Sequence, residues 1–151
     1  MEHFEIACLV ENESGVLTRV SSLFTRRGFN IHSLTVGETE NPDYSRITIS
    51  VNGDEAIRSQ CIKQLRKLYN VKQVKEMVPA ERVSRELALI KLRNTPETRP
   101  EIVNAVDIFR SKIIDFSPNT LCVEITGDSE KINAFITVVE PYGILEMCRT
   151  G

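Results

Sequence analysis

Apolar and polar positions along the first half of the chain change their spacing in a regular order. An apolar run at residues 4–10 has the length of a buried strand, and apolar side chains then recur at helical spacing from Val16 to Phe24. Ile47, Ile49 and Val51 alternate with polar residues, which is typical of a strand with one buried face. These patterns predict, in order, strand 4–10, helix 16–27, strand 29–39, strand 46–51, helix 54–68 and strand 71–78.

Residues with known preferences for helix ends support the first helix. Ser14 is placed to act as its N-cap, because a serine hydroxyl can accept a hydrogen bond from the first helical turn. Arg26 and Arg27 suit the negative end of the helix dipole. Gly28 can adopt the left-handed conformation that ends a helix.

The same order of patterns repeats after a short linker that begins at Pro79. Pro100 fits the first turn of a helix, and Pro141 and Gly143 fit the end of another. The second half is expected to contain strand 86–93, helix 100–109, strand 113–116, strand 121–126, a helix capped by Asp128 or Ser129 that runs to Val139, and strand 144–148.

Both halves therefore follow the order β-α-β-β-α-β, the ferredoxin-like split βαβ arrangement. We expect an α+β protein with two ferredoxin-like βαββαβ domains in tandem. The first domain spans residues 1–78, a linker spans 79–84, and the second domain spans 85–151.

Composition and charge indicate an ordinary soluble protein, with 41% hydrophobic and 26% charged residues and a formal net charge of −2. Residues 1–78 carry ten basic and ten acidic side chains, and residues 79–151 carry nine and eleven. Such a balance gives no electrostatic support for nucleic acid as a partner. The chain has no apolar run of about 20 residues that could span a membrane. Its acidic N-terminus does not resemble a signal peptide, so we expect a cytoplasmic protein.

The four cysteines are Cys8, Cys61, Cys122 and Cys148. They lie far apart in the sequence, among apolar neighbours, and no two form a C-x-x-C pair. This distribution predicts small buried hydrophobic residues in a reducing compartment rather than a disulfide framework or a metal site.

Residues for catalysis do not stand out. His3 and His32 are the only histidines, and neither has a neighbour in a motif that would orient it as a base. His32 lies on a predicted strand, where a surface or packing role is expected. The sequence has no phosphate-binding loop, no dinucleotide-binding motif and no nucleophile elbow. We therefore expect no catalytic residue, no metal ligand and no cofactor on this chain.

The segment Asn12-Glu13-Ser14-Gly15-Val16-Leu17 joins a predicted strand to a predicted helix. The free N–H groups at a helix N-terminus can hold a carboxylate, and glycine lets a ligand approach the main chain. The side chain of Asn12 adds an acceptor for an α-ammonium group. These features suit a free amino acid, although the same residues also suit a turn and a helix cap with no ligand.

Several blocks resemble the regulatory small subunit of acetohydroxyacid synthase, also called acetolactate synthase. The two longest are Val10-Glu11-Asn12-Glu13-Ser14-Gly15-Val16-Leu17 and Leu23-Phe24-Thr25-Arg26-Arg27-Gly28-Phe29-Asn30-Ile31. Further similar blocks lie at residues 33–37, 45–49, 85–91, 108–115 and 149–151, so the resemblance spans nearly the whole chain.

The resemblance implies that the first domain is an ACT domain, which binds amino acids at the interface of a homodimer. By motif position, Asn12, Gly15, Val16 and Leu17 would bind the effector, with Asn30 and Ile31 contributed by the partner protomer. The effector implied for this family is valine, sometimes with leucine or isoleucine.

The resemblance also implies a catalytic large subunit as partner, which the small subunit would activate and make sensitive to feedback inhibition by valine. Thiamine diphosphate, Mg²⁺ and FAD are expected on that partner. Relatives commonly continue a little past the final R-T-G. Two interpretations stay open: the lack of such a tail weakens docking to the catalytic subunit, or the chain is a fragment of a longer protein.

Two other functions remain open from the residues alone. One is a stand-alone amino-acid sensor that controls transcription or transport, which a basic face or a DNA-binding element would favour. The other is a small enzyme with an unrecognised site, which turnover by the isolated chain would favour. The even charge distribution argues against the first, and the lack of a candidate base argues against the second.

Overall fold

The computed structural model describes residues 3–151 and divides the chain into two compact units, Met1–Arg82 and Val83–Thr150. Met1 and Glu2, which begin the predicted first domain, lie outside the described residues. The boundary falls within the segment 79–84 that the sequence indicates as a linker, and this segment contains a short 3₁₀ turn, Pro79–Glu81.

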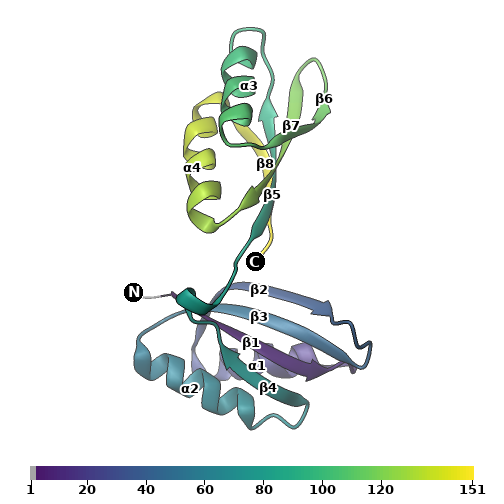
Figure 1. Cartoon of the computed structure of the whole chain (residues 1–151), viewed down its shortest axis with the longest axis vertical. Helices are drawn as coiled ribbons and strands as arrows, with labels where there is room; N and C mark the ends of the chain where they lie inside the picture. The colour runs from purple at the N-terminus through teal and green to yellow at the C-terminus, as the bar shows by residue number, and fades with distance from the viewer. Residues whose placement is uncertain (1–2) are drawn as a thin grey trace. The chain divides into compact units, whose positions relative to one another are not determined.

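The N-terminal unit is a four-stranded antiparallel sheet with two helices on one face (Figure 1). Its strand order is β2-β3-β1-β4, so β2 and β4 are the two edge strands. The elements are β1 (His3–Glu11), α1 (Val16–Arg27), β2 (Asn30–Glu38), β3 (Tyr44–Asn52), α2 (Glu55–Arg66) and β4 (Val71–Glu76).

Alternation along the two central strands builds the core of this unit. Side chains at even positions of β1 and at odd positions of β3 point toward the helices and are buried. They pack against the apolar face of α1 and the buried residues of α2. The buried cluster consists of Phe4, Ile6, Cys8, Val10, Val16, Val20, Leu23, Phe24, Ile47, Ile49, Val51, Cys61, Leu65 and Val74.

The residues at the ends of α1 and α2 test the helix caps that the sequence predicts. Gly28 follows α1 with a φ of 69°, as predicted for a left-handed C-terminal residue. Asp54 caps α2 by accepting a hydrogen bond from the N–H of Ile57. The expectation for Ser14 was wrong, because Gly15 occupies the N-cap position of α1 and no side chain caps this helix.

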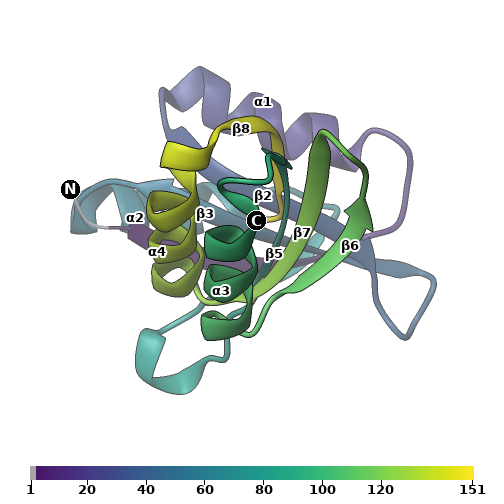
Figure 2. The same ribbon diagram turned by 90° about the horizontal axis from the view of Figure 1, so that it is seen from above.

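The C-terminal unit repeats the architecture, with strand order β6-β7-β5-β8. Figure 2 shows α3 and α4 side by side on one face of this second sheet. The elements are β5 (Glu86–Arg93), α3 (Arg99–Ile108), β6 (Lys112–Phe116), β7 (Thr120–Gly127), α4 (Ser129–Val139) and β8 (Ile144–Arg149). The predicted fold, two βαββαβ units in tandem, is thus confirmed.

Each unit contains an edge-to-face pair of phenylalanines in its core. The ring centroids of Phe24 and Phe29 lie 5.9 Å apart, and those of Phe109 and Phe135 lie 5.3 Å apart. Phe24 and Phe135 are fully buried. They anchor α1 and α4, respectively, to their sheets.

The cysteines divide into two groups. Cys8 and Cys61 are buried as predicted, and burial raises the pKa of the Cys8 thiol to about 12 and that of Cys61 to about 11. For the other two the prediction of burial was wrong, because Cys122 is half-buried and Cys148 is exposed. Both lie on the sheet face turned away from α3 and α4, since their strand partners Lys91 and Leu89 alternate with the buried residues of β5.

No helix among residues 3–151 is long and apolar enough to cross a membrane.

Candidate functional site

The turn between β1 and α1 is fastened to the hairpin that joins β2 to β3. The main-chain N–H of Asn12 donates to the carbonyl of Asp43 at 2.8 Å. The side-chain amide of Asn12 donates to Glu38 Oε1 at 3.1 Å and to the Pro42 carbonyl at 3.0 Å. Both amide protons are therefore in use, which leaves Oδ1 of this exposed side chain as an acceptor.

Gly15 closes the turn in a left-handed conformation, with a φ of 87°. A Cβ atom at this position would have no atom of a non-adjacent residue within 4 Å, so the space beside its main chain is open. A small ligand can reach the backbone at this point.

The N-terminus of α1 differs from those of the other three α-helices in residues 3–151. Asp54 and Asp128 cap α2 and α4 with their side chains, and α3 carries Glu101 in its first turn. Helix α1 has neither a side-chain cap nor an acidic residue in its first turn. Neither its cap nor its first turn therefore offsets the partial positive charge of this helix end, which favours an anionic group at this position.

Val16 and Leu17, the first residues of α1, differ in exposure. The side chain of Val16 is buried in the core, whereas Leu17 is 43% exposed. Leu17 thus offers an apolar surface beside the helix N-terminus, and Val16 contributes chiefly through its main chain.

Asn30 and Ile31 lie at the opposite end of the sheet from Asn12. Glu11, which precedes Asn12, is paired with Tyr44, whereas Asn30 is paired with Asn52 at the far end of β3. These positions are about 26 Å apart along a strand that rises ~3.3 Å per residue. One protomer does not bring the six predicted effector residues together. In addition, the side chain of Ile31 packs against the core, so its main chain is the part available to a ligand.

A polar network behind the turn was not expected from the sequence. Asn70, which is 1% exposed, donates through Nδ2 to Glu11 and Glu13, each at 3.2 Å. Its Oδ1 accepts a hydrogen bond from Arg19, which also donates to the hydroxyl of Tyr69. The network joins the β1–α1 turn to helix α1 and to the loop between α2 and β4.

An ion pair between β1 and β4 adds to this network. Lys72 Nζ lies 2.7 Å from Glu11 Oε1. This contact, with help from Asn70, lowers the pKa of Glu11 below its ordinary 4.5, and Glu11 in turn raises the pKa of Lys72 above 10.5. The lowered pKa of Glu11 stabilises the fold above about pH 4.5, and this is lost as pH falls through the folded-state value. The raised pKa of Lys72 means that this residue also stabilises the fold below about pH 10.5. That stabilisation is lost as pH rises through the folded-state pKa of Lys72. The pair is therefore intact at neutral pH.

The two histidines lie together on the sheet. The rings of His3 and His32 are 4.7 Å apart, centroid to centroid, in an edge-to-face arrangement. His32 is placed at an irregularity in the pairing of β2 with β3. The predicted surface or packing role agrees with this contact between two exposed side chains.

Comparison with protein families matches both units. Residues 6–73 match the model described as "AHAS small subunit-like ACT domain". Residues 85–151 match the model described as "Small subunit of acetolactate synthase". The two matches together cover most of the chain.

Individual relatives agree over the full length. The chain is 52% identical to a probable acetolactate synthase small subunit of Archaeoglobus fulgidus, over 100% of this chain and 94% of that protein. It is 51% identical to the acetolactate synthase small subunit of Mycolicibacterium smegmatis, over 97% of this chain and 86% of that one. The crystal structure of the small subunit from Thermotoga maritima superposes with a TM-score of 0.92 at 44% identity, covering 100% of this chain and 94% of that one.

Proposed function

Because the chain belongs to the acetolactate synthase small-subunit family, we propose that it activates the catalytic large subunit of that enzyme and makes it sensitive to valine. The observation that carries the effector part of this proposal is the uncapped N-terminus of α1, beside the open main chain of Gly15. Thiamine diphosphate, Mg²⁺ and FAD belong to the catalytic partner in this proposal, and the small subunit supplies no chemical group to the reaction.

Free valine has three groups that this turn can recognise. Its carboxylate accepts hydrogen bonds from the first-turn N–H groups of α1. Its ammonium group donates to Oδ1 of Asn12, whose amide protons are already bound to Glu38 and Pro42. Its isopropyl group packs against the exposed side chain of Leu17. A site that binds both a carboxylate and an ammonium group would select free amino acids.

The edge strand β2 supports a homodimer that completes this site. One side of β2 pairs with β3, and its other edge is free within the sheet. Antiparallel pairing with a second copy of β2, centred on Leu34, would place the partner's Asn30 beside Glu38. Glu38 already accepts a hydrogen bond from Asn12. A two-fold axis at Leu34 would therefore bring together residues that one protomer holds about 26 Å apart, at ~3.3 Å per residue.

We expect the chain to be a dimer of about twice its 17.1 kDa mass in light scattering at micromolar concentration. Leu34→Asp should yield monomers, because it places two like charges at the two-fold axis in the pairing proposed. The matched control is Leu145→Asp, at an apolar position of β8 that is somewhat more exposed than Leu34, and it should leave the dimer intact. A wild-type chain that stays monomeric with and without valine would contradict the arrangement.

Selectivity among amino acids follows from the same contacts. Valine should bind about tenfold more tightly than alanine, since each buried methylene contributes ~0.8 kcal/mol. Aspartate and lysine should bind much more weakly, because their side-chain charges would lose hydration against Leu17 without gaining a partner. Calorimetric titration with these four amino acids measures the order, and equal affinity for aspartate and valine would refute the pocket.

Inhibition requires that valine binds one arrangement of the two-subunit complex more tightly than another, since a ligand shifts an equilibrium only by its differential affinity. Reconstitution tests the proposal as a whole. The rate of the purified catalytic subunit is measured alone, with this chain, and with this chain plus valine. We expect a rise on addition of the chain and a fall on addition of valine. A rate that the chain leaves unchanged would exclude the proposed function.

A further inference from the structure

Basic side chains gather on the helices of the N-terminal unit, although the charges of residues 1–78 balance. Helices α1 and α2, with both cap residues of α2, carry seven basic residues and two acidic residues, Asp54 and Glu55. The basic residues are Arg19, Arg26, Arg27, Arg58, Lys63, Arg66 and Lys67. The fold thus gives the helix layer a net charge of +5, since seven minus two is five.

Few of these cations have an anionic partner. Arg58 forms ion pairs with Glu55 and Glu76, at 3.2 Å and 3.0 Å. Within residues 3–151, none of the other six lies within ion-pair distance of a carboxylate. Like charges held on one surface repel one another, and this raises the affinity of the layer for an anion.

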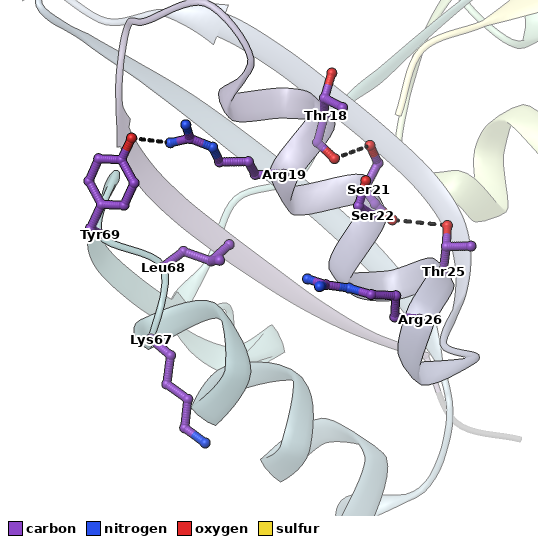
Figure 3. Close-up of a pocket in the computed structure, with 9 residues that line it drawn as sticks. All are labelled: Thr18, Arg19, Ser21, Ser22, Thr25, Arg26, Lys67, Leu68 and Tyr69. Carbon is purple, nitrogen blue, oxygen red and sulfur yellow. Dashed lines mark hydrogen bonds between the residues drawn. The ribbon is translucent and has the colours of Figure 1, made fainter.

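A groove between α1 and α2 collects three of the cations (Figure 3). Its volume is about 790 Å³, which lies within the range of small-molecule sites. Among residues 3–151, no carboxylate lines it. The lining residues are Thr18, Arg19, Ser21, Ser22, Thr25, Arg26, Lys67, Leu68 and Tyr69.

The donors are spread along the groove rather than gathered at one point. Arg19 lies at the end near Tyr69, whose hydroxyl and ring both hold its guanidinium. Arg26 comes from the last turn of α1, and Lys67 from the end of α2. Leu68 lies between them as an apolar surface. Cations at separate positions around one hollow suit a ligand that has more than one charged group.

The hydroxyl groups of α1 contribute unequally. Ser21 and Thr25 donate their protons to carbonyls of the preceding helical turn, so these two groups are acceptors toward the groove. Thr18 and Ser22 lie one turn apart on the same helix and retain hydroxyl protons for a ligand oxygen. Tyr69, at the rim, is 69% exposed.

We propose that the α1–α2 groove is a binding site for a small polyanion with at least two phosphate groups, held by Arg26 and Lys67 and completed by Arg19. A single carboxylate or phosphate would reach only part of this set. Nucleic acid or an acidic protein would use the helix layer as a continuous surface, including Arg27 and Arg66 outside the groove. The site does not depend on the proposed valine response, because its residues differ from those assigned to the effector.

Calorimetric titration of the full chain with inorganic pyrophosphate, without metal ions, tests this site. We expect saturable binding at one site per chain. The double variant Arg26→Gln/Lys67→Gln should bind about tenfold more weakly or worse, because each charge-assisted hydrogen bond contributes ~1.5 kcal/mol or more. The matched control is Arg27→Gln/Arg66→Gln, which removes the same charge from exposed positions of the same helices outside the groove.

The control double variant should lose no more than about twofold in affinity, as expected for screened charges at a distance. Equal weakening of both double variants would show a diffuse electrostatic surface and overturn the proposal. The absence of saturable binding would also overturn it. Tighter binding of an oligonucleotide than of pyrophosphate would assign the surface to nucleic acid instead. NMR titration of the unaltered chain gives an independent measure, with amide shifts expected at residues 18–26 and 67–69. Shifts confined to other residues would overturn it.

Discussion

A small subunit that carries Gly15→Asp is expected to activate its catalytic partner but to transmit almost no valine inhibition. The new carboxylate would occupy the place proposed for the carboxylate of valine, at the uncapped N-terminus of α1. Repulsion between the two charges and loss of the open space beside Gly15 both oppose binding. Removal of one charge-assisted interaction and addition of a repulsion should weaken valine binding by about a hundredfold or more.

The structure also predicts the cost of this substitution to the fold. Gly15 has a φ of 87°, so any side chain there is strained by about 1–2 kcal/mol. Aspartate tolerates left-handed backbone better than most residues, and an acidic group near a helix N-terminus regains ~0.3–1 kcal/mol. The Cβ of the new side chain has no atom of a non-adjacent residue within 4 Å. We therefore expect a folded domain.

Gly15→Asn is the matched control, because asparagine has the same shape and similar tolerance of left-handed backbone but no charge. It should retain a weakened valine response, whereas Gly15→Asp should retain none. The measurement is the rate of the reconstituted enzyme over a range of valine concentrations, together with a thermal melt of each variant. A well-folded Gly15→Asp subunit that still transmits full inhibition would falsify the placement of the effector at this helix.

Phe135→Ala is expected to destabilise the C-terminal unit by about 3–5 kcal/mol, which is a large part of the stability of a small domain. The side chain is fully buried in the second core and forms an edge-to-face pair with Phe109. Its truncation leaves a cavity under α4 and removes the aromatic contact. The N-terminal unit has a separate core and should keep its fold.

Phe24→Ala is the corresponding change in the N-terminal unit, because Phe24 is equally buried and pairs with Phe29. Amide hydrogen exchange followed residue by residue separates the two effects. Phe135→Ala should accelerate exchange in β5–β8 and leave valine binding intact, whereas Phe24→Ala should accelerate exchange in β1–β4 and abolish binding. If either variant loses protection throughout the chain, the two units unfold as one.

Much of the fold could be predicted from the sequence because its signals are local. Alternation along β3 and Asp54 before α2 act within a few residues of the positions they determine. Gly28 likewise ends α1 through its own backbone conformation. Burial of the cysteines was predicted less well. The strand pattern placed Cys122 and Cys148 among apolar neighbours. It did not show that these two side chains lie on the face of the second sheet that α3 and α4 do not cover.

The polar network and the basic groove could not be predicted in the same way. Arg19 and Asn70 are 51 positions apart, and no local pattern marks them as partners. Charges counted over each half of the chain concealed the separation of basic helices from acidic strands and loops. A signal was nevertheless present, since the predicted helix 16–27 contains three arginines and no acidic residue. The net charge of this single predicted helix therefore indicates a basic surface that the charge of the whole first half does not show.

The two edge strands of the N-terminal sheet differ in a way that controls how far assembly can proceed. Between its ends, β2 presents mainly small or apolar residues, including Leu34, Val36 and Gly37, whereas β4 carries Lys72 and Lys75. Pairing of β2 with a second β2 joins identical edges and closes on itself, so it stops at two chains. Further growth of the sheet would need β4 to pair as well, and lysines on an edge strand are a common obstacle to such pairing. This sheet can thus share one edge without becoming a template for aggregation.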